Sequence, residues 1–363
     1  MLLCGILMNI IELDYINHTK KSLVEKFINS TSCKKYILGI NKLTKSVQKH
    51  IQVDGIIDDF SRVQRSRKKT VLNINDVDNK NSIILFTSSG SPLEVKNHLD
   101  KMGFVNISYL DFYKYSGFNL ITPPFMGDFI DDFKQNQDKY QWLYSKLEDE
   151  KSKQIFEKLI NFKISFDYDF MQGFTNNHTE QYFDKQLIKY QKDIVFVDGG
   201  GYVGDTLPQI IECFPNFKKI YLIEPNKLHI NIAKRDFKNV PNIEFINCGL
   251  GKEKITIQDN TTSNNCDHNY QAVNINTIDN LIDEKVDFIK LDIEGAEQDA
   301  IEGAKDIIKN YKPILAICIY HKADDWYKVP QKVLEINRDY KVYLRHYMEG
   351  IYETVLYFIP RSA

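Results

Sequence analysis

The chain has 363 residues, of which 43% are hydrophobic and 26% are charged, the proportions of an ordinary globular protein of about two domains. Its 22 Phe and 21 Tyr residues exclude disorder as the dominant state, because they supply much surface to bury. The 47 basic and 49 acidic residues give a net charge of -2, so no strong field attracts nucleic acid or an anionic membrane.

The features that bear on localisation favour the cytoplasm. No apolar run approaches the ~20 residues that span a bilayer. The apolar start, residues 1–8, lacks the basic region and the cleavage site of a signal peptide. The six cysteines are scattered and form no CxxC pair, so we expect reduced thiols rather than a disulfide scaffold or a zinc site. The basic run at residues 62–69 predicts a solvated loop.

Residues 1–116 alternate between strand and helix patterns. Strands are expected at 36–40, 51–59, 82–86 and 105–109, and helices at 42–50 and 93–102. Such alternation implies a parallel sheet, so we predict a small Rossmann-like α/β domain. Because no Gly-rich loop follows its first clear strand, we predict that this domain is not catalytic.

Residues 117–190 have a different composition and predict a helical connector. The stretch 128–159 is rich in Lys, Glu, Gln and Asp, with apolar residues at helical spacing. The positions expected to form its buried face are Trp142, Leu143, Leu147, Ile155, Phe156, Leu159 and Ile160.

Residues 191–363 return to a β-α-β pattern, which is clearer than the first. Strands are expected at 194–198, 219–224, 243–247, 286–292 and 314–320. Two further strands, 341–346 and 353–359, are joined by six residues around Gly350, a spacing that suits a closing antiparallel hairpin.

A glycine loop follows the first strand of this region and opens a helix. Gly199, Gly201 and Gly204 match the pattern G-x-G-x-x-G, which lets a nucleotide approach a strand-to-helix turn. Asp198 and Asp205 flank the loop, and two carboxylates would repel a pyrophosphate such as that of NAD. The pair suits a cofactor with positive charge, such as S-adenosylmethionine.

An acid at the end of the next strand is a candidate for binding the ribose of either cofactor. Glu224 lies 20 residues after Gly204, where a carboxylate accepts hydrogen bonds from two ribose hydroxyls. The alternative is a carboxylate that only caps the following helix.

Three acids follow the strand that ends at Leu291. Asp292 and Glu294 are expected to orient a substrate hydroxyl or the methionine part of the cofactor. A competing interpretation is a Mg²⁺ site made of Asp292, Glu294 and another oxygen ligand, but we assign no metal. Glu297 is interpreted as a first-turn helix acid.

Two basic side chains lie at strand ends nearby. His321 is a candidate general base for a sugar hydroxyl, with a structural histidine as the alternative. Arg345 is either a clamp for an anionic substrate group or, as we slightly prefer, an exposed hairpin end.

Together these segments resemble the FkbM-type family of S-adenosylmethionine-dependent O-methyltransferases. The matching segments, in order, are 181–184, 195–206, 222–226, 287–304, 317–321, 343–347 and 353–357. The resemblance implies a class I methyltransferase sheet of seven strands with the last one antiparallel. It also implies methyl transfer to a hydroxyl, often on a sugar or a polyketide.

The resemblance carries roles over to particular residues. Those implied to bind the cofactor are Asp198, Gly199, Gly201 and Glu224, to which the loop pattern adds Gly204 and the acidic strand end adds Asp292. Those implied to line the reaction centre are Asp292, Glu294 and His321. The first 115 residues are similar, around 55–59, to small α/β domains that precede catalytic domains in surface-polysaccharide enzymes. We expect them to serve homo-oligomer assembly or substrate presentation.

The sequence therefore predicts a cytoplasmic methyltransferase. It would move a methyl group from S-adenosylmethionine to a hydroxyl of a small molecule or glycan, most simply a sugar precursor of a bacterial surface polysaccharide. Nucleic acid is not expected as a partner. Two alternatives stay open, an NAD-dependent sugar-nucleotide oxidoreductase and a non-catalytic scaffold that keeps the cofactor site.

Overall fold

The computed structural model describes residues 7–58, 71–258 and 272–361. The basic run at 62–69, Asp59, Cys4, Cys266 and most of the apolar start lie outside these residues. The described cysteines Cys33, Cys213, Cys248 and Cys318 are free. Within the described residues, no helix combines the length and apolar character needed to cross a bilayer.

The first unit is a five-stranded parallel sheet in the order β3-β2-β1-β4-β5. Its strands are β1 (Lys34–Leu38), β2 (Gly55–Ile57), β3 (Val71–Leu72), β4 (Ser82–Phe86) and β5 (Val105–Ser108). Its helices are α1 (His18–Asn29), α2 (Lys42–Gln48), α3 (Pro92–Lys101) and α4 (Tyr109–Tyr115), and a 3₁₀ turn spans Ile74–Asp76. The predicted Rossmann-like fold is confirmed. Strand β2 is shorter than predicted, because only three of its residues pair with β1.

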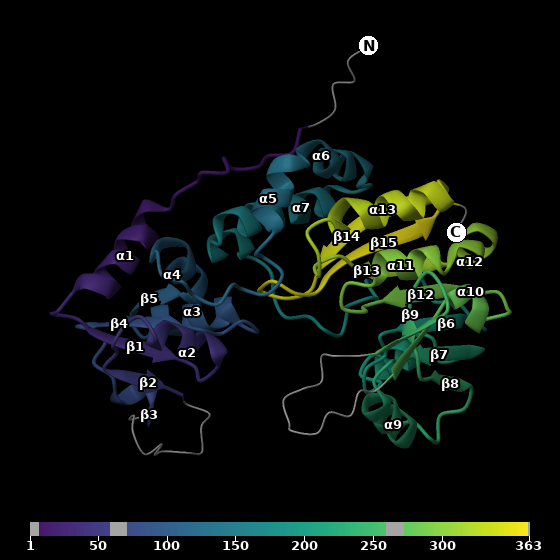
Figure 1. Cartoon of the computed structure of the whole chain (residues 1–363), viewed down its shortest axis with the longest axis horizontal. Coiled ribbons are helices and arrows are strands. Elements are labelled where there is room, and N and C mark those ends of the chain that lie inside the picture. Colours follow the sequence, from purple (N-terminus) through teal and green to yellow (C-terminus); the bar gives the residue numbers. More distant parts are fainter. Residues whose placement is uncertain (1–6, 59–70, 259–271, 362–363) are drawn as a thin grey trace, which may run out of the picture.

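Three helices follow the first unit and pack against the end of the chain. They are α5 (Phe129–Gln135), α6 (Gln137–Lys146) and α7 (Glu150–Ser165), followed by a 3₁₀ turn at Tyr168–Met171. Their apolar faces are buried as the helical spacing predicts, with Leu143, Phe156 and Ile160 fully enclosed. Helix α7 lies against β14, and α6 lies against α13, as Figure 1 shows.

The second unit is a seven-stranded sheet in the order β14-β15-β13-β12-β6-β7-β8. Its strands are β6 (Val195–Gly199), β7 (Lys219–Ile223), β8 (Ile243–Ile246), β12 (Phe288–Leu291), β13 (Ile314–Cys318), β14 (Tyr340–His346) and β15 (Thr354–Pro360). Strand β15 runs antiparallel to both of its neighbours, and the strands from β13 to β8 are parallel. This arrangement confirms the predicted class I methyltransferase fold.

Helices cover both faces of this sheet, and a small sheet lies beside it. The helices are α8 (Leu207–Cys213), α9 (Lys227–Asp236), α10 (Ile278–Leu281), α11 (Glu297–Glu302), α12 (Lys305–Tyr311) and α13 (Asp325–Ile336). Strands β9 (Gly249–Leu250), β10 (Ile255–Gln258) and β11 (Ala272–Asn276) form the small sheet, which the sequence did not predict. Helices α8 and α9 share one core with Phe196 and Phe288, and α10 to α13 lie on the opposite face.

The two units share a continuous core. One buried cluster runs from the first sheet through α5 to α7 and on to the α11–α13 face of the large sheet. The turn of the β14–β15 hairpin points toward the first unit (Figure 1). The predicted domain limits at residues 116 and 190 stay predictions, because this continuity gives no sharp boundary.

Candidate functional site

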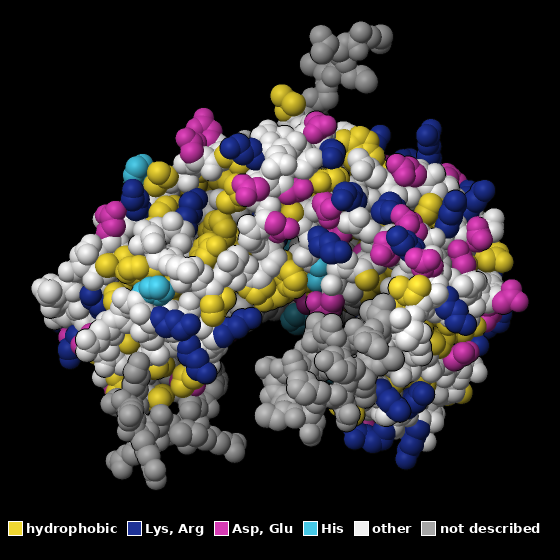
Figure 2. All heavy atoms as spheres, in the orientation of Figure 1, with side chains coloured by type: hydrophobic (Ala, Val, Ile, Leu, Met, Phe, Trp, Pro, Cys, Tyr) yellow, Lys and Arg dark blue, Asp and Glu magenta, His cyan; other side chains and the backbone are white. Residues whose placement is uncertain are grey.

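A cavity of about 700 Å³ opens at the carboxyl ends of the central strands of the large sheet, where open parallel sheets bind ligands. In Figure 2 the surface is hollowed between the two units, with acidic and histidine side chains at the head of the hollow. The residues that line the cavity are His178, Gln181, Tyr182, Phe183, Gly200, Tyr202, Asp205, Thr206, Gln209, Glu224, Pro225, His229, Lys290, Asp292, Ile293, Glu294, Tyr320 and Glu353.

The glycine loop is packed tightly against its own protein. A Cβ on Gly200 would lie 1.9 Å from the Asp292 carbonyl oxygen, and the φ of +75° at this residue also favours glycine. A Cβ on Gly201 would lie 2.3 Å from the Leu222 side chain, and Gly204, at φ +84°, faces Phe237. These glycines therefore let the loop fold onto β7 and β12, and of the loop glycines it is Gly200 that reaches the cavity.

Glu224 closes one end of the cavity just beyond β7. One of its carboxylate oxygens accepts the amide hydrogen of Tyr202 at 3.1 Å, and the other accepts that of Asn226 at 2.8 Å. The side chain is nearly buried, at 7% exposure of the residue, yet it lines the cavity. Fixed in this way, the carboxylate keeps lone pairs that can accept hydrogen bonds from a vicinal diol.

Asp198 is buried beneath the loop and is paired with a lysine. Its Oδ1 lies 2.9 Å from Lys290 Nζ, which also donates to the Gly200 carbonyl at 2.8 Å. Burial alone would lower the pKa of Lys290, but Asp198 and Asp292 outweigh it and raise that pKa, so the lysine stays charged. The pair fixes the loop on the neighbouring strand β12.

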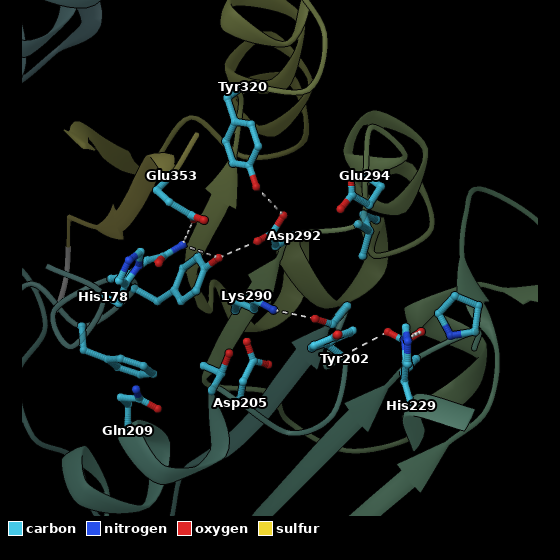
Figure 3. Close-up of a pocket in the computed structure, with 18 residues that line it drawn as sticks. His178, Tyr202, Asp205, Gln209, His229, Lys290, Asp292, Glu294, Tyr320 and Glu353 are labelled. Carbon is cyan, nitrogen blue, oxygen red and sulfur yellow. Dashed lines mark hydrogen bonds and ion pairs between the residues drawn. The ribbon is translucent and has the colours of Figure 1, made fainter. Parts of the chain in front are cut away.

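Asp292 lies between the two ends of the cavity and is held by two tyrosines. Tyr182 donates to Oδ2 at 2.8 Å, and Tyr320 donates to Oδ1 at 3.3 Å. Burial, followed by the charge of Asp292, raises the pKa of Tyr182 well above its ordinary value, so this hydroxyl stays a donor. Figure 3 shows Glu353 and His178 on one side of Asp292, and His229 on the other.

Behind Asp292 lies a buried histidine held between carboxylates. His321 Nδ1 lies 3.1 Å from Glu297 Oε1, and its Nε2 lies 3.4 Å from Asp292 Oδ1 and 3.6 Å from Glu294 Oε2. Burial lowers the pKa of His321, but these carboxylates, led by Glu297, raise it above the ordinary value. Asp292, Glu297 and His321 offer ligand atoms within 4.8 Å of one another, a spacing that a metal ion could use. Glu297 lies beside Nδ1 of the ring and Asp292 lies beside Nε2. A chain of ion pairs through the histidine therefore explains this arrangement without a metal ion.

Glu353 enters the cavity from the end of the hairpin. It precedes β15 with a φ of +62°, and Gln181 Nε2 donates to its Oε2. Burial, reinforced by the charge of Asp292, raises the pKa of Glu353 to about 7. The cavity thus contains a carboxyl group that exchanges a proton near neutral pH.

The comparisons with known proteins identify the second unit. Residues 196–342 match the family model described as Methyltransferase FkbM domain. These residues form an FkbM methyltransferase domain. No curated protein gives a significant match to the chain.

One solved structure shares the fold over nearly the whole chain, and others match about half of it. The methyltransferase FkbM from Methylobacillus flagellatus KT superposes with a TM-score of 0.74 at 21% identity, over 94% of each chain. A putative rRNA methylase from Clostridium thermocellum matches 51% of this chain and 96% of its own, at 11% identity and a TM-score of 0.36. A putative methyltransferase from Streptococcus mutans, in complex with SAH, matches 49% of this chain and 94% of its own, at 15% identity and a TM-score of 0.33.

Within the FkbM domain, the residues singled out by sequence divide into two groups. Glu224, Asp292 and Glu294 line the cavity. The residues predicted at the site that lie behind its wall are Asp198, Gly199, Gly201, Gly204 and His321. Their side chains or backbones support the wall, and His321 has a side chain that is only 1% exposed. Roles for these residues in contact with ligand stay predictions.

The sequence did not assign roles to four residues that shape the cavity, Gln181, Tyr182, Tyr320 and Glu353. Three of the segments that resemble the family contain these residues, namely 181–184, 317–321 and 353–357. Arg345 was interpreted wrongly, since it is 2% exposed and pairs with Asp184 and Asp149 at 2.7 Å. This buried guanidinium anchors the segment that carries Gln181 and Tyr182.

Proposed function

We propose that the chain transfers a methyl group from S-adenosylmethionine to a hydroxyl of a sugar or glycan precursor, in the biosynthesis of a bacterial surface polysaccharide. The observation that carries the proposal is the charge of the cavity. Among the described lining residues, Asp205, Glu224, Asp292, Glu294 and Glu353 are carboxylic acids, and Lys290 is the sole lysine or arginine. Because Lys290 is already paired with Asp198, little positive charge remains for an anion.

This charge favours a cationic cofactor over a dinucleotide. A pyrophosphate needs free donors or cations at the helix N-terminus, whereas Asp205 lies there. A sulfonium and an ammonium group are instead stabilised by nearby carboxylates. These considerations argue against the alternative of an NAD-dependent oxidoreductase.

The residues present fit S-adenosylmethionine in position and chemistry. Glu224, held by two backbone amides, suits the ribose hydroxyls, and Asp292 and Asp205 suit the charged methionine part. When bound, the cofactor supplies a methyl group on a sulfonium that a hydroxyl oxygen can attack. His321 would hold Asp292 in place from behind, and Glu294, whose side chain is 84% exposed, would contact the acceptor at the rim.

The acceptor end of the cavity is suited to a sugar. Tyr182, Tyr320 and Phe183 offer aromatic surface, and Gln181 and His178 offer polar groups beside it. A sugar ring presents apolar faces that pack on aromatic rings and hydroxyl groups that need such partners. The net negative lining favours a neutral or amine-bearing sugar over a phosphorylated one.

The test is calorimetric titration with S-adenosylhomocysteine and, separately, NADH. The proteins are the wild type, Glu224→Ala and a matched control, Glu244→Ala, which removes an exposed carboxylate from the adjacent strand β8. We expect micromolar binding of S-adenosylhomocysteine by the wild type and the control, and a loss of at least about tenfold in Glu224→Ala. Tight NADH binding, or no binding of S-adenosylhomocysteine by the wild type, contradicts the proposal.

A further inference from the structure

We propose that Glu353 is the catalytic base that takes the proton from the acceptor hydroxyl, a role that rests on the proposed methyl transfer. The residue lies on the turn that joins β14 to β15 and faces the same end of the cavity as His178 and Tyr320 (Figure 3). It was not among the catalytic residues predicted from the sequence, and it is partly buried.

Two of the other candidate bases, His321 and Asp292, are enclosed or occupied. His321 is separated from the cavity by Asp292, and both of its ring nitrogens face carboxylates. Both oxygens of Asp292 accept hydrogen bonds, from Tyr182 and Tyr320. Glu353 differs from these two residues. Its Oε2 accepts a hydrogen bond from Gln181, whereas its Oε1 accepts none from a side chain or backbone that the structure describes. One carboxylate oxygen therefore remains for an incoming hydroxyl.

The surroundings of Glu353 set its affinity for a proton. Burial and the charge of Asp292 raise its pKa, whereas Gln181, Lys290 and His321 lower it, and the balance lies at about 7. A sulfonium bound beside Asp292 adds a positive charge to the same space. That charge lowers the pKa of Glu353 further, so binding of the methyl donor converts the group to the ionised form that can act as a base.

The transfer balances with this base and no other reactant. The O–H bond of the acceptor breaks and its proton passes to Glu353, while an oxygen lone pair forms the new O–C bond. The electron pair of the C–S bond stays on sulfur, which leaves neutral S-adenosylhomocysteine. The proton on Glu353 then exchanges with water when the cavity opens.

The backbone around Glu353 is fixed at both ends, as a positioned base requires. Its positive φ is uncommon for a non-glycine residue. Its carbonyl accepts the amide hydrogen of Tyr347 at 3.1 Å across the hairpin. Four residues earlier, Glu349 accepts two amide hydrogens from helix α3, so the turn is held by the first unit as well.

The test measures protons released on ligand binding, by calorimetry at pH 7 in buffers of different ionisation enthalpy. The ligands are S-adenosylmethionine and S-adenosylhomocysteine, which differ by the sulfonium charge. The wild type should release about half a proton more with S-adenosylmethionine, because a group with a pKa near 7 is half protonated at this pH. Glu353→Gln should abolish the difference and bind S-adenosylhomocysteine within about threefold of the wild type.

A matched control is Glu335→Gln, which changes an exposed carboxylate on helix α13 and should keep the wild-type difference. An unchanged difference in Glu353→Gln overturns the assignment of the proton to Glu353. A second measurement uses the wild type alone. Because binding of S-adenosylmethionine would require Glu353 to lose its proton, the affinity for S-adenosylmethionine relative to that for S-adenosylhomocysteine should fall as the pH drops from 8 to 6. A ratio independent of pH between 6 and 8 overturns the proposal, whereas no binding of either ligand overturns the proposed function itself.

Discussion

The carboxylate of Glu349 accepts the amide hydrogen of Leu93 at 2.9 Å, although 256 residues separate the two in sequence. The amide of Glu94 donates to the same oxygen at 2.9 Å. Glu349 thus caps helix α3, whose N-terminus lies at the carboxyl end of β4, where a Rossmann-like sheet would hold a phosphate. The first unit uses this position to hold the β14–β15 hairpin of the large sheet.

Replacing Glu349 with Ala should lower the free energy of unfolding by about 1–2 kcal/mol, because the helix loses a cap and a favourable charge at its positive end. Urea denaturation measures the loss. Hydrogen exchange should also become faster at the amides of Leu93 and Glu94. Glu335→Ala, on an exposed face of α13, should leave both measurements unchanged. Equal losses in the two variants would show that the cap contributes nothing.

Gly200→Ala should unfold the glycine loop. The added methyl group would overlap the Asp292 carbonyl, and the φ of +75° disfavours alanine, so we expect a destabilisation of about 3 kcal/mol or more and loss of S-adenosylhomocysteine binding. Gly90→Ala is the control, because a Cβ there meets no described atom within 4 Å. Thermal unfolding with and without S-adenosylhomocysteine tests both effects. Wild-type binding by Gly200→Ala would mean that the loop tolerates the overlap.

Asp184→Asn should destabilise the protein and loosen the cavity wall. Asp184 pairs with the buried Arg345 guanidinium at 2.7 Å, and removal of one partner from a buried ion pair costs about 3 kcal/mol. Asp236→Asn removes a carboxylate from an exposed Arg–Asp pair of equal length and should have no measurable effect. Chemical denaturation compares the two. Similar stabilities would indicate that Arg345 is satisfied by Asp149 alone.

His346 should make the protein sensitive to mild acid. Burial, reinforced by the Lys163 charge, lowers the pKa of His346 to about 3, whereas an unfolded histidine titrates near 6.5. The unfolded state therefore binds more protons below pH 6.5, and stability should fall by about 2 kcal/mol between pH 7 and pH 5 from this group. Urea unfolding of the wild type and His346→Asn across this range measures the contribution. The slope should be smaller in the variant, and parallel slopes would contradict it.

The sequence predicted the large sheet well because its strands are short apolar runs separated by turn signals. The run from Ile314 to Cys318 is buried on both faces, so local composition and tertiary environment agree. The β14–β15 hairpin was predicted from the short loop between its two strands. Strands β10 and β11 were missed because their pairing depends on partners outside the main sheet.

The site was less predictable, because side-chain neighbours are set by packing rather than by spacing. The strand ends placed Asp292 and Glu224 correctly at the cavity. The position of a residue at a strand end could not reveal that His321 faces Glu297 behind Asp292. It also could not reveal that Glu353 reaches the cavity from the start of β15, which lies next to β13 in the sheet. From the sequence, we explained the loop glycines by the close approach of a nucleotide. In the structure, the space that a Cβ would fill is taken by Asp292 at Gly200 and by Leu222 at Gly201.

The position of β15 determines when the protein can become functional during its synthesis. This strand lies between β14 and β13 in the sheet, yet residues 354–360 are translated after both of these neighbours. Until they emerge from the ribosome, β13 presents an unpaired edge, β14 has no partner on this side, and Glu353 has no fixed backbone. Such late, long-range pairing slows folding and exposes strand edges to aggregation. A nascent chain should therefore depend on chaperones until β15 is inserted.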